Sequence, residues 1–284
     1  MTTVADWEGA TGDSWGDMYQ ATDRAFAALT QLMLERLVSI PGDSILDIGC
    51  GAGELAIALA ETRPSARVIG VDVSPPLVDV ARSRVRDAAN PAFELADAAT
   101  WQGQGFTPDL LVSRHGVMFF DDPVAAFAHL LDQSAPSASL LFSCFRDPPG
   151  NEWAAGPVRL LDLPGGGDPD APGPFAFSDD ARVRSILAQA GWRGITAEPV
   201  DFPFLVGSGA DPVGAGIVFL QRIGPAARAL AAMEPAAREK ALRKIERWLH
   251  DAQQGDIVAF PARAWIVTAR KPEGFPADRA IRSH

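Results

Sequence analysis

Glycines and acidic residues crowd into one short stretch, ILDIGCGAGE, at residues 45–54. An apolar run leads to Asp47, three glycines follow at alternate positions, and an apolar helical pattern begins at Glu54. Glycines between a strand and a helix leave backbone N–H groups free at the helix start and let a ligand approach the main chain. The stretch therefore predicts a ligand site at the carboxyl end of a strand.

The spacing of the glycines indicates which ligand fits. A dinucleotide fingerprint reads G-x-G-x-x-G/A, whereas Gly49, Gly51 and Gly53 give G-x-G-x-G, with Glu54 where the last small residue would stand. A carboxylate at that helix start disfavours a pyrophosphate. Because Asp47 adds a further negative charge, the pattern favours a phosphate-free ligand with both a cation and a carboxylate. S-adenosylmethionine, with its ammonium, sulfonium and carboxylate groups, has this chemistry.

Two later acidic residues follow the next two predicted strands. Asp72 ends the strand over 67–71, where an acidic side chain can accept hydrogen bonds from both ribose hydroxyls. Asp97 follows the strand over 92–95, where it can accept a bond from an adenine amino group. Taken alone, Asp72 can equally serve to stabilise the start of the following helix.

Apolar periodicity places these residues in an alternating pattern of strands and helices. We expect strands over 44–48, 67–71, 92–95, 109–113 and 137–145, and helices over 23–38, 54–61, 76–88 and 121–131. Such alternation predicts an α/β fold, a parallel sheet with helices on both faces.

The chain should form one elaborated domain. Its expected parts are an N-terminal helical segment covering the cleft (1–40), a cofactor-binding core (41–146), a Pro/Gly-rich insertion or lid (147–177), a C-terminal part (178–272) and a tail (273–284). The C-terminal part should contain a helix over 178–190, a sixth strand over 195–206, a cap of two helical stretches over 211–252 and a last strand over 264–269.

Four motifs together resemble those of the class I S-adenosylmethionine-dependent methyltransferases. ILDIGCGAG resembles their first motif, GVDVS their second, ELADAATW their third, and DLLVSRHGVMFF the fourth-strand motif that borders the substrate. The resemblance is strongest over about residues 34–145 and is to the small-molecule type, such as the methyltransferases of ubiquinone and menaquinone biosynthesis. It implies a Rossmann-like, seven-stranded, mostly parallel sheet whose last strand, AWIVTA, runs antiparallel between strands five and six.

The resemblance also implies S-adenosyl-L-methionine as cofactor, S-adenosyl-L-homocysteine as product, and a set of cofactor-lining residues. These are Asp47, Gly49, Cys50, Gly51, Asp72, Val73, Asp97, Ala98, Ser113 and Tyr19.

Methyl transfer requires that the acceptor's lone pair be aligned behind the C–S bond and that water be excluded. A base is needed only for an acceptor that is protonated at neutral pH. His115 is the candidate catalytic base, because it follows the fourth strand and histidine titrates in the useful range. It can also simply hydrogen-bond the turn, and relatives often carry an aromatic residue there. Arg114 can bind a substrate anion or pair with Asp121 or Asp122.

Aromatic residues outside the core motifs are candidate substrate contacts. Trp15 and Trp153 join Arg114 and His115 in the predicted substrate site. With Trp7, Met18, Tyr19 and Phe175 they would form an apolar cover over the cleft, which favours a mostly apolar or aromatic acceptor. Ordinary core packing of these side chains is the alternative.

Composition restricts the remaining choices. A formal net charge of -11 argues against nucleic acid and anionic membranes as partners, so a small-molecule acceptor is expected. The two cysteines have no zinc or disulfide spacing, and the histidines and carboxylates show no metal-ligand pattern, so we expect no metal. The sequence shows no signal peptide and no apolar run of roughly 18 residues. We therefore expect a cytoplasmic protein without membrane insertion. Oligomeric state stays open. An NAD(P)-dependent oxidoreductase and a noncatalytic S-adenosylmethionine-binding protein remain alternatives.

Overall fold

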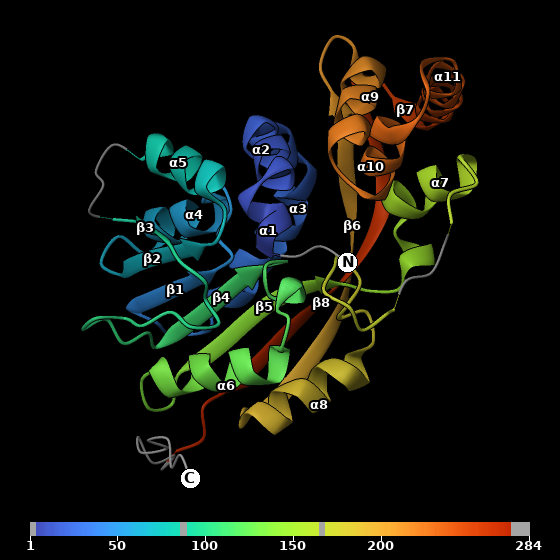
Figure 1. Cartoon of the computed structure of the whole chain (residues 1–284). Coiled ribbons are helices and arrows are strands. Elements are labelled where there is room, and N and C mark those ends of the chain that lie inside the picture. Colours follow the sequence, from blue (N-terminus) through green and yellow to red (C-terminus); the bar gives the residue numbers. More distant parts are fainter. Residues whose placement is uncertain (1–3, 86–89, 165–167, 274–284) are drawn as a thin grey trace.

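A mixed sheet forms the centre of the molecule. The structure, a computed structural model, describes residues 4–85, 90–164 and 168–273. The sheet has eight strands, of which seven follow the order β3-β2-β1-β4-β5-β8-β6, while β7 pairs only with β8 (Figure 1). The strands are β1 (Ser44–Ile48), β2 (Arg67–Asp72), β3 (Ala92–Leu95), β4 (Leu110–Arg114), β5 (Ser139–Phe145), β6 (Arg193–Ser208), β7 (Gln253–Gln254) and β8 (Ile257–Arg270).

Strand order and direction confirm the predicted Rossmann-like fold. β1 pairs in parallel with β2 and β4, β4 pairs in parallel with β5, and β8 runs antiparallel between β5 and β6. β8 contains the AWIVTA segment expected at this place. Residues 45–48 of β1 are all buried, as is typical of a central strand that helices cover on both faces.

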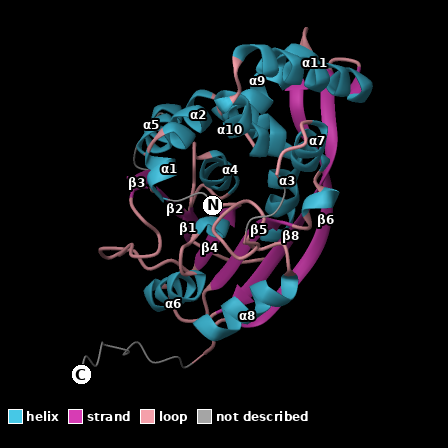
Figure 2. Ribbon diagram, turned by 45° about the vertical axis from the view of Figure 1, so that its right-hand side comes forward, coloured by secondary structure: helices cyan, strands magenta, loops and turns pink. Residues whose placement is uncertain are grey.

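β6 and β8 are longer than predicted and form an arm beyond the parallel strands (Figures 1 and 2). Both strands contain prolines, and Pro203 faces Pro261 across their ladder. Proline is tolerated in a strand where no ladder hydrogen bond is needed. β6 is an edge strand, so its prolines can face the side that has no neighbouring strand. The pairing of β8 with β5 ends at Ala264, so Pro261 has no β5 partner to which it would need to donate. The predicted sixth strand already ran through its two prolines and is longer by two residues at each end, whereas the last strand was predicted to begin only after Pro261.

Helices cover both faces of the sheet (Figure 1). α3, α4 and α5 lie on one face, while α6 and α8 pack together on the other. The helices are α1 (Val4–Glu8), α2 (Ala10–Asp17), α3 (Tyr19–Leu37), α4 (Glu54–Thr62), α5 (Pro75–Arg84), α6 (Pro123–Gln133), α7 (Glu152–Leu160), α8 (Asp180–Ala190), α9 (Pro212–Arg222), α10 (Pro225–Ala232) and α11 (Pro235–Ala252), with short 3-10 turns η1 (Val117–Phe119) and η2 (Pro148–Gly150). α5 ends before the predicted boundary, and residues 86–88 of that predicted helix lie outside the described residues.

The N-terminal helices dock closely on the start of α5. Gly12 and Gly16 of α2 face this contact, since a Cβ on Gly12 would stand 2.3 Å from Ser74 Oγ and one on Gly16 would stand 3.5 Å from Pro76 Cβ. Two small residues one helical turn apart thus let α2 approach α5. This contact fixes the N-terminal segment beside the ends of the strands.

The Pro/Gly-rich stretch after Arg146, which the sequence indicated to be irregular, contains α7. Pro157 lies inside this helix, and an added Cβ on Gly156 would approach the Trp248 ring of α11 to 2.4 Å. Packing against α11 therefore outweighs the local cost of proline and glycine. The predicted cap over 211–252 holds three helices instead of two. The proposed division of the chain into parts stays a prediction, and only residue 273 of the expected tail is described.

Among the described residues, no helix combines the length and apolar composition that a bilayer crossing requires. Within the same ranges, no group of three His, Cys, Asp or Glu side chains is placed to hold a metal ion.

Candidate cofactor and acceptor site

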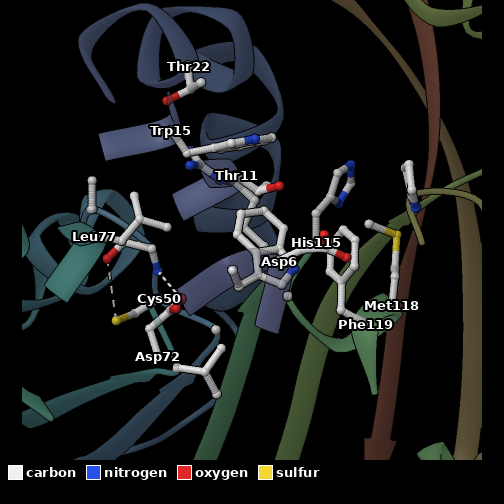
Figure 3. Close-up of a pocket in the computed structure, with 18 of the residues that line it drawn as sticks. Asp6, Thr11, Trp15, Thr22, Cys50, Asp72, Leu77, His115, Met118 and Phe119 are labelled. Carbon is white, nitrogen blue, oxygen red and sulfur yellow. Dashed lines mark hydrogen bonds between the residues drawn. The ribbon is translucent and has the colours of Figure 1, made fainter. Parts of the chain in front are cut away.

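A cavity of about 1200 Å³ opens at the carboxyl ends of the parallel strands (Figure 3). Its walls come from the loops after β1, β2, β3 and β4, from α1 to α3, and from the α9–α10 region of the arm. Pockets for one small ligand span roughly 300–1,000 Å³. The cavity is therefore large enough for a cofactor and a second small molecule.

The glycine loop has the open main chain that its sequence predicts. Gly49, Gly51 and Gly53 have φ angles of +64°, +55° and +82°, a region that favours glycine. A Cβ on Gly49 would stand 2.8 Å from Gly116 Cα, so this glycine permits close packing of two loops. Gly51 lines the cavity and has nothing within 4 Å of an added Cβ, so its main chain is open to a ligand.

Asp47 is the least compensated polar group in the cavity wall. Its residue is 1% exposed, and neither carboxylate oxygen has a hydrogen-bond partner of normal geometry. Burial raises the pKa of Asp47 to about 7, and the Asp72 carboxylate adds to this shift; the Arg114 guanidinium and the nearby Ala56 backbone N–H oppose it. A buried carboxylate without a partner is costly, so the site suits a ligand that brings positive charge or a donor.

Asp72 has a double role at the end of β2. Its Oδ2 accepts a hydrogen bond from Gly51 N at 2.8 Å, and its Oδ1 accepts one from Ser74 N at 2.9 Å. Asp72 thus stabilises both the glycine loop and the start of α5, as the local alternative suggested, while it also lines the cavity. Burial raises the pKa of Asp72, and the backbone hydrogen bonds oppose that shift.

Most of the other predicted cofactor residues lie in the cavity wall. Asp97 is exposed there, and its Oδ1 accepts a bond from Ala99 N at 2.8 Å. The remaining members in the wall are Gly49, Cys50, Val73 and Ala98. The Cys50 thiol is buried against Gly70 of β2, and burial together with the nearby aspartates raises its pKa.

Two predicted cofactor residues lie outside the cavity wall. Ser113 is fully buried in β4, where its Oγ donates to Ile48 O at 2.7 Å and accepts from Gly116 N at 3.1 Å. It therefore holds the turn after β4 against β1. Tyr19 instead packs beneath Arg84, whose guanidinium carbon lies 5.1 Å from the ring centroid.

Arg114 is an internal ion-pair partner of Glu54. The two side chains are in direct contact, and Arg114 also donates to Thr30 Oγ1 at 2.9 Å. The predicted pairing with Asp121 or Asp122 is wrong; Asp122 instead caps α6 by accepting from Ala125 N. Glu54 is absent from the residues that form the cavity wall. The acidity near the glycine loop therefore comes from Asp47 and Asp72.

His115 stands at the turn after β4 with a φ of +64° and points into the cavity (Figure 3). Its Nδ1 lies 2.8 Å from Ser143 Oγ, whereas its Nε2 is buried without a partner. Burial lowers the pKa of His115 to about 3, and the positive charge of Arg114 contributes in the same direction. The imidazole is therefore neutral at pH 7.

Five rings form a continuous aromatic wall on the far side of the cavity. His115 lies 4.0 Å from Phe145 and 5.3 Å from Phe26, measured between ring centroids. Trp153 contacts both Phe145 and Phe204, with ring centroids 5.2 Å and 4.4 Å away. Phe204 in turn lies 5.0 Å from Phe26, so the five rings form a closed series of contacts. We call these five residues the aromatic wall. The sequence had indicated His115 and Trp153 but missed the three phenylalanines.

Further aromatic residues line the cavity from α1, α2 and η1. Trp7 of α1 packs against Trp15 of α2 at 5.5 Å and against Phe119 at 5.1 Å between ring centroids. All three line the cavity, whereas Met18, Tyr19 and Phe175 of the predicted cover do not. α9 and α10 also line the cavity, with some of the residues between 221 and 231. The sequence did not connect these two helices with the site.

Comparison with known proteins agrees with this geometry. A family model described as a methyltransferase domain matches residues 45–136. The trans-aconitate 2-methyltransferase of Methylobacterium radiotolerans is 33% identical over 139 residues, which is 48% of this chain and 48% of the relative, so the chain spans about half the length of that relative. The trans-aconitate 2-methyltransferase of Streptomyces coelicolor is 28% identical over 260 residues, covering 85% of this chain and 81% of the relative.

A solved structure of Haemonchus contortus phosphoethanolamine N-methyltransferase 2, in complex with phosphomonomethylethanolamine and S-adenosylhomocysteine, has the same fold. It matches with a TM-score of 0.54 at 17% identity, over 91% of this chain and 58% of that chain. The methyltransferase domain over residues 45–136 and the two relatives support a class I S-adenosylmethionine-dependent methyltransferase, and the solved structure shows that the fold agrees.

Proposed function

We propose that the protein transfers a methyl group from S-adenosylmethionine to a small, largely apolar acceptor. One observation carries the proposal: the unpartnered, buried carboxylate of Asp47 shares a cavity with a glycine loop that is open at Gly51. A carboxylate suits a ligand cation, and the open space beside the Gly51 main chain admits a ligand carboxylate, while the Gly51 N–H itself donates to Asp72. The amino-acid part of S-adenosylmethionine has both groups.

The residues after β2 and β3 suit the nucleoside part. A carboxylate can accept about four hydrogen bonds, two at each oxygen. Each oxygen of Asp72 accepts one, from Gly51 N and from Ser74 N. It therefore retains capacity for ribose hydroxyls. Asp97 offers an oxygen beside the small side chain of Ala98, which suits an adenine edge.

When bound, the cofactor supplies an electrophilic methyl group; the acceptor's lone pair forms the new bond as the C–S electron pair passes to sulfur. The chain contributes alignment and exclusion of water. Trp7, Trp15 and Phe119 cover the cavity, and the aromatic wall borders its interior. The base role of His115 stays a prediction, and its low pKa favours acceptors that are nucleophilic without a strong base.

The charges of the cavity favour an acceptor without multiple negative charges. Among the described residues, each arginine that lines the cavity is ion-paired with a carboxylate: Arg114 with Glu54, Arg222 with Asp17, and Arg228 with Asp6. Asp6 and Asp23 of the wall are themselves paired with arginines, and five further described aspartates line it, namely Asp47, Asp72, Asp97, Asp121 and Asp122. A polycarboxylate such as trans-aconitate would meet like charges there. We therefore expect no methylation of trans-aconitate above the enzyme-free blank, although both relatives described above are named for that acceptor.

Calorimetric titration with S-adenosylhomocysteine tests the cofactor assignment. We expect saturable heat and thermal stabilisation by this ligand. No heat with ligand in the high micromolar range would contradict the proposal. Stabilisation by NADH in place of the adenosyl ligand would instead support the oxidoreductase alternative, in which Asp72 holds the ribose of NAD.

The noncatalytic alternative has one observation in its favour, the weak basicity of His115. Incubation with methyl-labelled cofactor and a panel of phenols, thiols and amines separates the two functions. Label in any acceptor supports transfer, whereas tight cofactor binding without transfer across the panel favours a sensing or scaffolding role. Both cysteines are free thiols, which agrees with the reducing cytoplasm that we propose as the location.

A further inference from the structure

Two ring nitrogens in the aromatic wall have no hydrogen-bond partner. Nε2 of His115 and Nε1 of Trp153 are both buried and unpartnered, in residues that are 7% and 4% exposed. Both residues line the cavity, and both rings pack against Phe145, with ring centroids 4.0 Å and 5.2 Å from it. Buried N–H groups are rarely left without an acceptor, so each unpartnered nitrogen needs an explanation. A ligand in the cavity can supply it.

The hydrogen bond to Ser143 decides which nitrogen of His115 carries the proton. Ser143 is fully buried, and among the described residues its hydroxyl contacts one hydrogen-bond partner, His115 Nδ1 at 2.8 Å. If the buried Ser143 hydroxyl places its hydrogen on its neighbouring acceptor, Ser143 Oγ donates to Nδ1. The neutral imidazole then carries its proton on Nε2. In that tautomer His115 and Trp153 each carry a buried N–H donor within the cavity lining.

We propose that His115 Nε2–H and Trp153 Nε1–H form a two-donor site that holds an oxygen of the methyl acceptor, of the phenolate or enolate class. The five rings of the aromatic wall supply flat apolar contact, and the two donors supply the polar contacts. Donors stabilise an oxygen that carries negative charge more than a neutral one. The site thereby assists ionisation of the acceptor, and Ser143 acts as a positioning residue that sets the tautomer. The assignment rests on the proposed function.

A chromophoric phenol, 4-nitrophenol, tests the site, because its phenolate absorbs visible light. The titration uses the full chain saturated with S-adenosylhomocysteine, and absorbance reports both binding and ionisation. We expect the native protein to bind the probe and to shift its ionisation to lower pH. Trp153→Phe and His115→Phe each keep a ring and remove one donor, so each should weaken probe binding by about tenfold or more.

Two matched measurements keep the outcome specific. Trp265→Phe removes a ring N–H that already donates to Ser178 O at 2.9 Å, outside the cavity wall, so it should leave probe binding unchanged. In ¹⁵N-histidine spectra the native His115 should show a protonated Nε2, and Ser143→Ala should reduce that preference.

Three results would overturn the two-donor site while cofactor binding persists. They are no probe binding by the native protein, equal probe affinity in the native protein and both cavity variants, and an equal loss in Trp265→Phe. Failure of S-adenosylhomocysteine itself to bind would overturn the proposed function instead. If either Trp153→Phe or His115→Phe does not fold, the other variant still tests the two-donor site, because each removes a donor from a different element of the fold.

Discussion

Replacing Asp47 with asparagine should change how stability depends on pH. Burial raises the pKa of Asp47 from 3.8 to about 7 in the folded chain. The folded state then binds a proton more tightly than the unfolded state. The protonation of Asp47 therefore adds to the free energy of unfolding below the unfolded pKa, and this contribution is lost as pH rises through 7. At about 1.36 kcal/mol per pKa unit, the loss reaches roughly 4 kcal/mol above pH 7. Asp47→Asn cannot ionise and should escape this loss.

The same titration should couple to cofactor binding. A ligand cation beside Asp47 favours its ionised form, so below pH 7 the native protein must release a proton when it binds the cofactor. Affinity for S-adenosylhomocysteine should therefore rise about tenfold per pH unit between roughly pH 5 and 7, and then level off. Asp47→Asn should bind more weakly above pH 7 and show no such slope.

Calorimetry in two buffers of different ionisation enthalpy measures the released proton directly. Asp97→Asn is the matched control, because it removes an exposed carboxylate of the same cavity and should keep the slope. A pH-independent affinity in the native protein, or an equal slope in Asp47→Asn, would refute the reasoning. Chemical unfolding at about pH 4 and pH 8 tests the stability difference independently.

Three further predictions concern the loops and the acceptor. Asp72→Ala should weaken S-adenosylhomocysteine binding by about 1–3 kcal/mol, because it removes charge-assisted acceptors and a bond that fixes Gly51; an unchanged calorimetric affinity would show that the ribose lies elsewhere. Gly49→Ala should lower the melting temperature and abolish cofactor binding, since its Cβ would stand 2.8 Å from Gly116 Cα. The control is Gly105→Ala, which is also at positive φ but has nothing within 4 Å, so it should lower the free energy of unfolding by only about 1 kcal/mol. Equal melting temperatures of the two variants would count against the close contact at Gly49. Methyl-labelled cofactor should transfer no label to trans-aconitate, and turnover of that acid would mean that the cavity arginines exchange their partners.

Local chemistry explains why the sequence predicted the cofactor half of the site. Strand-to-helix alternation fixes a parallel sheet, and parallel strands bring their carboxyl ends to one edge. Asp47, Asp72 and Asp97 lie in or just after the carboxyl ends of β1, β2 and β3, so their proximity was predictable without knowing any other contact. Three glycines at alternate positions indicated a main chain with positive φ, which the structure has. Strand lengths in the arm were less predictable, because free strand edges tolerate the prolines that normally end a strand.

The acceptor half depends on contacts between distant segments. Phe145 ends β5 and was detectable in principle, because the same edge argument applies to it. Phe26 and Phe204 gave no signal, since an apolar residue in a helix or a long strand usually belongs to the core.

The sequence by itself determined the sheet, the glycine loop and the acidic residues at the strand ends, because each depends on local backbone preference and strand periodicity. The tertiary structure alone decided that Arg114 pairs with Glu54, that Ser143 orients His115, and that Trp153 reaches the same cavity. Those contacts depend on how helices and the β6–β8 arm dock. Docking is set by the shapes and charges of whole surfaces, which no short stretch of sequence contains.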